Sequence, residues 1–404
     1  MNVINSVQSR LLVLVIMTFA IPAVRAGSPE ALPDYTEIKG LATLGDIQSY
    51  DAWGAGEQFE LLIARKKTGN KSSLVLVTRK PDADLWTIRS ELPVGKGKIV
   101  SMRGNDVKLA GEGHHRIAVV QQQEDIPGNG PLHIYTSEDQ GRHWKHQGLP
   151  VKKDETRNQG YADIVYSNGA YLLAWLDDRE ENGNTQGLRT AVSLDQGKSW
   201  QAETTVDDAT CTCCWTRMVA DAGGGGWLLY RDHQPQDMAL AYRDPVTGSW
   251  SRKGPAGSYQ WDFNGCPHTG GGLAIAGQNI HAMVWTGKKE NAGLHYLAST
   301  DKGEHWTTDK MLDPNGKDGD LAVDETGQIV LAAWIQRVNN RNRVTIAISR
   351  DGGAHWSDSS VVGTDSLNAD HPEVIYASGQ FIVLWTERDG DKEKKLSGLQ
   401  VKKQ

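Results

Sequence analysis

Apolar residues in this chain occur in short runs separated by polar, glycine-rich segments, a pattern typical of β-strands. One kind of run recurs, often ends in an aromatic residue, and predicts strands at 59–64, 116–120, 171–175, 227–230, 281–285, 330–334 and 381–385. A further run follows most of them, at 132–136, 188–192, 238–242, 293–298 and 344–348, and an earlier one precedes them, as at 161–166 and 373–376. The pattern predicts an all-β chain built from a repeated unit of strands.

An eight-residue motif, Ser-x-Asp-x-Gly-x-x-Trp, recurs between these runs. Its four copies, at 137–144, 193–200, 299–306 and 349–356, contain Asp139, Asp195, Asp301 and Asp351, and degenerate copies lie at 78–86 and 244–250. In a hairpin turn the aspartate accepts hydrogen bonds from backbone N–H groups, and the glycine adopts a conformation that other residues resist. We interpret these aspartates as structural, because the motif lacks the further oxygen ligands of a calcium loop.

The motif joins the third strand of each unit to the fourth, so each unit is a four-stranded blade of a β-propeller. The repeated second strands predict seven blades, with six as the alternative if the first unit is irregular. The last unit ends at 396–401 without a fourth strand, and the segment 35–39 would supply one. This pairing would close the ring and remove the exposed edges of an open sheet. We expect a single propeller domain over 27–404.

The first 26 residues are expected to be a secretory signal peptide. Arg10 precedes an apolar run at 11–21, which is shorter than the about 20 residues that span a bilayer. Val24-Arg25-Ala26 places small residues where a signal peptidase cleaves. The alternative is a retained membrane anchor. Export would place the protein in a periplasm or outside the cell, with no membrane span after cleavage.

The charge of the chain argues against nucleic-acid binding. The formal net charge is −7, and residues of both signs are interspersed along the sequence. No basic patch of the kind that neutralises phosphates is present in the sequence.

All four cysteines lie in two short segments. Cys211, Cys213 and Cys214 precede the first strand of the fourth blade, and Cys266 and His268 precede the first strand of the fifth. Because these blades are neighbours, we expect the two segments to meet at one mouth of the central channel.

The same mouth is expected to carry His371 of the seventh blade as a further metal ligand. Three interpretations of the cysteines remain open: disulfides, which an oxidising compartment permits, a site for Cu(I) or Zn²⁺, which thiolate and imidazole ligands suit, and a redox or nucleophilic thiol.

The repeated motif resembles the Asp-box, or bacterial neuraminidase repeat, of the sialidase superfamily over nearly the whole mature chain. Sialidase activity would require an arginine triad, a tyrosine nucleophile with a glutamate, and an aspartic acid. The Phe/Tyr-Arg-Ile-Pro segment that carries the first arginine in that family is missing here, and Arg116-Ile117-Ala118 lacks the proline. That superfamily also includes non-enzymatic propellers, so the motif specifies fold better than activity.

Four residues on the expected channel loops are candidates for substrate binding: Arg157, Tyr161, Arg217 and Asp370. Four other arginines each follow a second strand, and we interpret them as solvated charges at turns: Arg179, Arg231, Arg337 and Arg388.

The sequence therefore favours an exported, sialidase-like propeller that is a non-catalytic binding protein with a Cys/His soft-metal site on the channel face. Its partners would be a metal ion, a glycan or another exported protein. The alternatives are an exo-sialidase or other glycoside hydrolase, and a disulfide-stapled scaffold for protein interactions.

Overall fold

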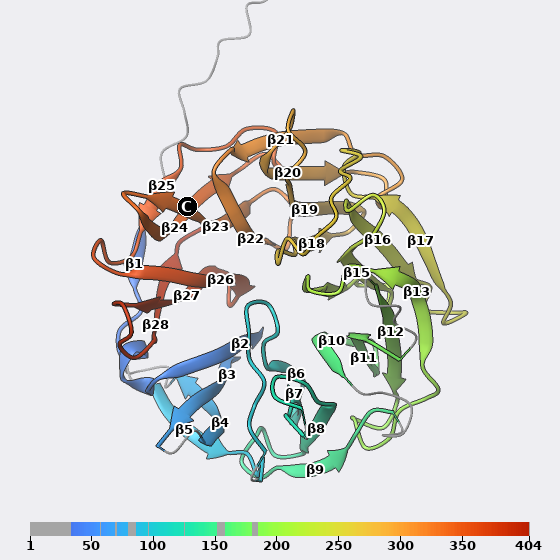
Figure 1. Cartoon of the computed structure of the whole chain (residues 1–404), viewed down its shortest axis with the longest axis vertical. Coiled ribbons are helices and arrows are strands. Elements are labelled where there is room, and N and C mark those ends of the chain that lie inside the picture. The colour runs from blue at the N-terminus through green and yellow to red at the C-terminus, as the bar shows by residue number, and fades with distance from the viewer. Residues whose placement is uncertain are drawn as a thin grey trace, which may run out of the picture.

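The chain folds into a ring of β-sheets (Figure 1). The computed structural model describes residues 34–56, 58–68, 71–79, 86–95, 97–124, 126–151, 158–179 and 185–403. In these segments the strands form seven four-stranded antiparallel sheets, so the propeller has seven blades and not six. The expected signal peptide at 1–26 lies outside the described residues.

The blades follow one another along the chain. The first contains β2 (Ile47–Ala55), β3 (Gln58–Lys67), β4 (Lys71–Arg79) and β5 (Trp86–Glu91), and the second contains β6 (Lys108–Glu112), β7 (His115–Gln121), β8 (Leu132–Ser137) and β9 (Lys145–Gly148). The third contains β10 (Gln159–Ser167), β11 (Ala170–Asp177), β12 (Gln186–Ser193) and β13 (Thr204–Thr210), and the fourth contains β14 (Arg217–Ala220), β15 (Gly226–Arg231), β16 (Met238–Arg243) and β17 (Trp250–Pro255).

The fifth blade contains β18 (Gly272–Ala276), β19 (Asn279–Thr286), β20 (Gly293–Ser299) and β21 (Thr308–Asp313), and the sixth contains β22 (Gly316–Val323), β23 (Val330–Val338), β24 (Arg341–Ser349) and β25 (Ser360–Val362). The seventh contains β26 (Asn368–Ala377), β27 (Gln380–Arg388), β28 (Lys395–Val401) and, from the other end of the chain, β1 (Tyr35–Glu37). A single 3₁₀ turn, η1 (Leu41–Leu44), connects β1 to the first blade among the described residues.

Pairing of the two ends of the chain closes the ring, which confirms the prediction from the sequence. β1 lies antiparallel to β28, with Tyr35 opposite Val401 and Glu37 opposite Leu399. The seventh blade thereby gains its fourth strand, and the ring has no unpaired junction between its first and last blades.

Large apolar side chains on the second strands hold neighbouring blades together. Trp175 on β11, Trp334 on β23 and Trp385 on β27 are all buried. These are the aromatic residues that end the recurring apolar runs of the sequence. Because both faces of these strands are covered by neighbouring blades, the runs are continuously apolar rather than alternating.

The Asp-box motifs form the turns expected of them. In the first copy, Ser137 Oγ donates to Asp139 Oδ1 at 2.8 Å, and the backbone N–H of His143 donates to the same oxygen at 2.9 Å. Gly141 N–H donates to Ser137 Oγ, and Trp144 Nε1 donates to the Gly141 carbonyl at 3.0 Å. The serine, aspartate and glycine contacts recur in the other three copies. The structural role predicted for these aspartates is thus visible in their contacts.

The degenerate copy at 244–250 keeps part of this geometry. Asp244 Oδ1 accepts hydrogen bonds from the backbone N–H groups of Val246 and Thr247. Asp84, in the copy at 78–86, lies outside the described residues.

Candidate metal centre

The cysteine-rich segment connects the third blade to the fourth. Cys211 follows β13 directly, and its backbone N–H donates to the carbonyl of Arg231 at 3.1 Å. The segment then turns, and Thr216 Oγ1 donates to the carbonyl of Tyr161 at 3.0 Å before β14 begins. Both ends of the segment are therefore held by neighbouring strands, which places the three cysteines between them in the interior.

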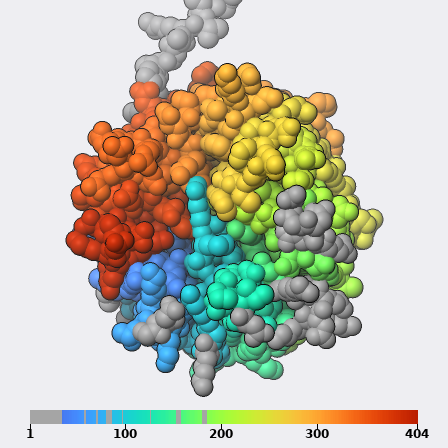
Figure 2. Space-filling model, viewed as in Figure 1, coloured from blue at the N-terminus to red at the C-terminus, as the bar shows by residue number. Residues whose placement is uncertain are grey.

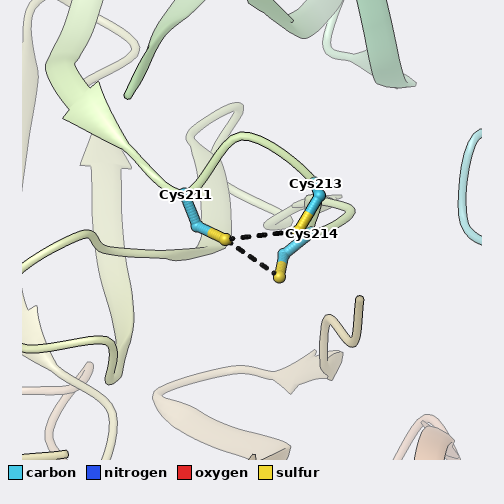
Figure 3. A group of neighbouring side chains, drawn as sticks. All are labelled: Cys211, Cys213 and Cys214. Carbon is cyan, nitrogen blue, oxygen red and sulfur yellow. Dashed lines mark hydrogen bonds between the residues drawn. The ribbon is translucent and has the colours of Figure 1, made fainter. Parts of the chain in front are cut away.

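The three thiols of this segment converge (Figure 3). Cys211 Sγ lies 3.2 Å from Cys214 Sγ and 3.8 Å from Cys213 Sγ. All three side chains are buried, with exposures of 2%, 5% and 1% for Cys211, Cys213 and Cys214. These separations are well above the about 2.05 Å of a disulfide bond, and all four cysteines are free.

A second group of potential ligands contains Cys213 again, now with Cys266 and His268. The ligand atoms within each group of three lie within 4.8 Å of one another. Cys266 and His268 are exposed, and Thr212 Oγ1 lies 3.4 Å from Cys266 Sγ. The expectation that the two segments meet is confirmed.

A buried arginine lies beside the thiols. Arg231 ends β15 and is 1% exposed, so its interpretation as a solvated turn charge is wrong, whereas Arg337 and Arg388 are exposed. Its guanidinium donates three hydrogen bonds to backbone carbonyls, those of Thr269, Gln236 and Trp285. Among the described residues, no ion pair includes Arg231.

Burial of a guanidinium without a carboxylate is costly, and a nearby negative charge offsets that cost. The thiols beside Arg231 supply such a charge when they ionise. Burial opposes ionisation of Cys214, but the thiols of Cys211 and Cys213 and the charge of Arg231 hold the pKa of Cys214 well below its usual value. The contact with Cys213 acts to lower the pKa of Cys211, but the contact with Cys214 and burial raise it to about 12.

Trp215 follows Cys214 directly and packs against two glycines. Its ring lies so close to Gly104 and Gly270 that a Cβ atom at either position would lie 2.1 Å or 2.5 Å from a ring atom. Gly104 also has φ +75°, where a side chain is strained. Figure 2 shows the segment 97–107, in cyan, lying over the centre of the ring. The tryptophan thus connects this covering segment to the cysteine segment.

A small pocket of about 80 Å³ lies beneath the covering segment, at the mouth of the channel. Its charged and tyrosine side chains come from five blades and the covering segment: Tyr50, Asp51, Arg103, Asp106, Lys108, Arg217, Asp318, Asp320, Asp370, His371 and Glu373.

The three cations of this pocket are already paired. Arg103 contacts Asp318, Arg217 Nη2 contacts Asp320 Oδ2 at 2.5 Å, and Lys108 Nζ lies 3.3 Å from Asp51 Oδ1.

Four acids that line the channel each tie one blade to the next. Asp51 accepts from the backbone N–H of Leu109 at 2.7 Å, and Asp163 accepts from Met218 at 2.7 Å. Asp320 accepts from Val374 at 2.9 Å, and Glu373 accepts from Ala52 at 3.3 Å. A carboxylate that accepts a backbone N–H satisfies a donor that would otherwise be orphaned in the interior. These acids therefore have a clear structural role.

The candidate substrate-binding residues fall in different places. Arg217 and Asp370 line the pocket, whereas Tyr161 is buried near the cysteines. Burial and the nearby cysteines raise the pKa of Tyr161 above its usual value. Arg157 lies outside the described residues.

His371 lies apart from the thiols. Its Nδ1 is 3.2 Å from Asp370 Oδ2, its carbonyl accepts a hydrogen bond from Tyr50, and it belongs to neither group of three ligands. The structure thus brings together five of the six ligands named from the sequence.

His371 lies on β26 of the seventh blade, whereas the cysteines lie beside the fourth and fifth blades, and its backbone geometry is unusual. Tyr161, Asp318 and His371 each sit at a bulge in a first strand, with φ near +50°. A bulge re-aims side chains relative to a regular strand. The sequence contains a faint signal of these bulges, since an acidic residue stands two positions after each of the three residues.

The fold and this site define a seven-bladed propeller with a sulfur-rich cluster at one mouth of its channel. No family model matches the chain, and no curated protein matches it in sequence. Its structure is similar to polysaccharide lyase Uly1, with 12% identity, 95% of each chain covered and a TM-score of 0.57. It is also similar to a PL25 ulvan lyase, with 11% identity over 90% of this chain and 94% of that one and a TM-score of 0.54.

Trypanosoma rangeli sialidase is a third similar structure, with 10% identity, 86% of this chain and 59% of the sialidase chain covered, and a TM-score of 0.51. At these identities the likeness shows the fold alone. The structural relatives thus include glycan-acting proteins. Within the described part of the chain, no helix is long and apolar enough to cross a membrane.

Proposed function

We propose that this protein is an exported, non-catalytic propeller that binds a soft metal ion through its cysteine cluster. The observation that carries the proposal is the convergence of three buried thiols, Cys211, Cys213 and Cys214, with Cys266 and His268 beside them. Thiolate and imidazole are the ligands that soft metals prefer. A propeller with seven apolar inter-blade cores has no need of this cluster for stability.

Copper in its Cu(I) state suits the buried group better than Zn²⁺. Structural zinc sites are almost always four-coordinate. Here only three ligand atoms from the described residues converge in the buried group. Cu(I) is soft and accepts three thiolates in a trigonal arrangement. The positive charge of Arg231 stabilises the excess negative charge of such a centre.

Glycan cleavage is less well supported by the pocket in the channel mouth. The cavity of about 80 Å³ is small beside the about 300–1,000 Å³ of typical ligand pockets. Its three cations each have a carboxylate partner, so none is free to grip the acidic group of a sugar.

The proposal is tested by adding Cu(I), as its acetonitrile complex and without oxygen, to the reduced protein. Copper retained after desalting is measured together with free thiols. We expect stoichiometric copper in the wild type and in Asn264→Ala, an exposed control near Cys266, and loss of copper in the double variant Cys211→Ser/Cys213→Ser. A wild type that retains no copper, or that isolates with two intact disulfides, would contradict the proposal.

A further inference from the structure

The two groups of ligands have one member in common. Cys213 belongs both to the buried group, with Cys211 and Cys214, and to the outer group, with Cys266 and His268. Among the described residues, these five ligand atoms do not form a single group within 4.8 Å. One ion therefore cannot take all five ligands without a movement of the two segments.

The two groups also differ in their access to solvent. The other two ligands of the buried group, Cys211 and Cys214, are at most 2% exposed, whereas both other ligands of the outer group are exposed. An ion in the outer group can exchange directly with a ligand in solution. An ion in the buried group can leave only through its shared ligand or after the segment opens.

We propose that the cluster holds two Cu(I) ions that share the sulfur of Cys213. The outer site, Cys213 with Cys266 and His268, receives and releases copper, and the inner site, Cys211 with Cys213 and Cys214, retains it. This inference rests on the proposed function, because it assigns a stoichiometry and a direction of transfer to the same site. A bridging thiolate lets an ion move inward by exchanging one ligand at a time, without passing through water.

The charges of the cluster allow a second cation without a larger net charge. Four cysteine thiols lose their protons to solvent when they bind, and no electron is transferred because copper is supplied as Cu(I). One Cu(I) ion bound by the thiolates of Cys211, Cys213 and Cys214 leaves a net charge of −2, and a second ion bound with the thiolate of Cys266 also leaves −2. The buried charge of Arg231 compensates part of the remainder. Because the net charge is the same with one ion or two, the second ion does not raise the desolvation cost of the cluster.

Copper stoichiometry in single variants tests the inference. We expect the wild type and Asn264→Ala to retain two equivalents after desalting. His268→Ala and Cys266→Ser lose the outer ion, and Cys211→Ser and Cys214→Ser lose the inner one, so each retains one equivalent. Cys213→Ser is expected to lose both ions to a concentration of bathocuproine disulfonate that leaves the wild type loaded.

Two further measurements keep the test valid if a buried variant fails to fold. X-ray absorption of the wild type needs no substitution, and copper–copper scattering is expected at two equivalents but not at one. His268→Ala changes an exposed side chain and should keep the tryptophan fluorescence and thermal midpoint of the wild type. Its remaining copper should pass to the chelator more slowly than the first equivalent leaves the wild type.

The outcomes separate the two proposals. A wild type with a single equivalent, lost alike in Cys211→Ser and Cys266→Ser, would overturn the shared pair and leave copper binding intact. Two equivalents of which Cys213→Ser loses only one would also overturn the sharing. A wild type that binds no copper would refute both the inference and the proposed function.

Discussion

Replacement of His281 is expected to remove a loss of folding stability that occurs as the pH falls. His281 lies on β19 and is 1% exposed, with Nδ1 at 2.7 Å from the hydroxyl of Tyr296 on β20. Its Nε2 has no hydrogen-bond partner among the described residues. Because burial penalises the charged imidazole, the pKa of His281 falls from 6.5 to about 4.

The lowered pKa sets the size and the direction of the effect. Above pH 6.5 the imidazole is neutral in the folded and unfolded chains and contributes no pH dependence. Between pH 6.5 and pH 4 the unfolded chain takes up a proton that the folded chain does not, so the folded state loses stability as the pH falls. At about 1.4 kcal/mol per unit of pKa difference, the loss reaches about 3 kcal/mol by pH 4. Below pH 4 the folded chain also binds the proton and the loss stops growing.

The assay is urea unfolding followed by tryptophan fluorescence at half-unit steps from pH 7.5 to pH 4. His281→Asn keeps a polar atom near the Tyr296 hydroxyl and cannot take up a proton. As the pH is lowered, the unfolding free energy of this variant should fall less than that of the wild type. The difference between the two free energies should grow by about 3 kcal/mol between pH 6.5 and pH 4. His114→Gln, which changes an exposed histidine, is the control. Parallel pH profiles for wild type and His281→Asn would refute the reasoning.

Three other predictions concern the turns, the channel mouth and the ties between blades. Hydrogen bonds from the turn lower the pKa of Asp301 to about 2. The contribution of its carboxylate to stability is therefore complete above pH 4 and is lost as the pH falls to 2. A carboxyl NMR titration of Asp301 with a midpoint near pH 4 would contradict this. Gly104→Ala should displace the covering segment, because the new Cβ atom would meet the ring of Trp215. The unfolding free energy should fall by about 1–3 kcal/mol. Unchanged thermal stability and protease resistance would count against this prediction. Asp163→Ala leaves the N–H of Met218 buried without its acceptor and should lower the unfolding free energy by about 1–3 kcal/mol. Asp163→Asn keeps an oxygen acceptor and should lower it less. Equal losses in the two variants would show that this hydrogen bond is not the cause.

Strand order, blade number and ring closure could all be predicted from the sequence. The runs that end in Trp175, Trp334 and Trp385 recur because every blade buries the same strand between two neighbours. The Asp-box turns were equally legible, since their hydrogen bonds join residues at most four positions apart. Patterns of this kind depend on contacts within one unit, which a single sequence records directly.

The meeting of the two cysteine segments also followed from the order of the blades. The sequence does not show which thiols face one another, and the membership of Cys213 in both ligand groups emerges only from the folded loops. His371 was expected to join these ligands, but it lies on the seventh blade and contacts Asp370 instead.

Arg231 shows most clearly what tertiary structure decided. In the sequence it resembles Arg337 and Arg388, which lie at the ends of second strands and are exposed. In the fold it is enclosed by two loops and strand β19, whose carbonyls accept all its observed hydrogen bonds. The sequence by itself determined the repeated strands and their closure into a ring, because those depend on local periodicity. Only the folded ring decided which side chains share its mouth, because those contacts join residues distant along the chain through loops that follow no repeat.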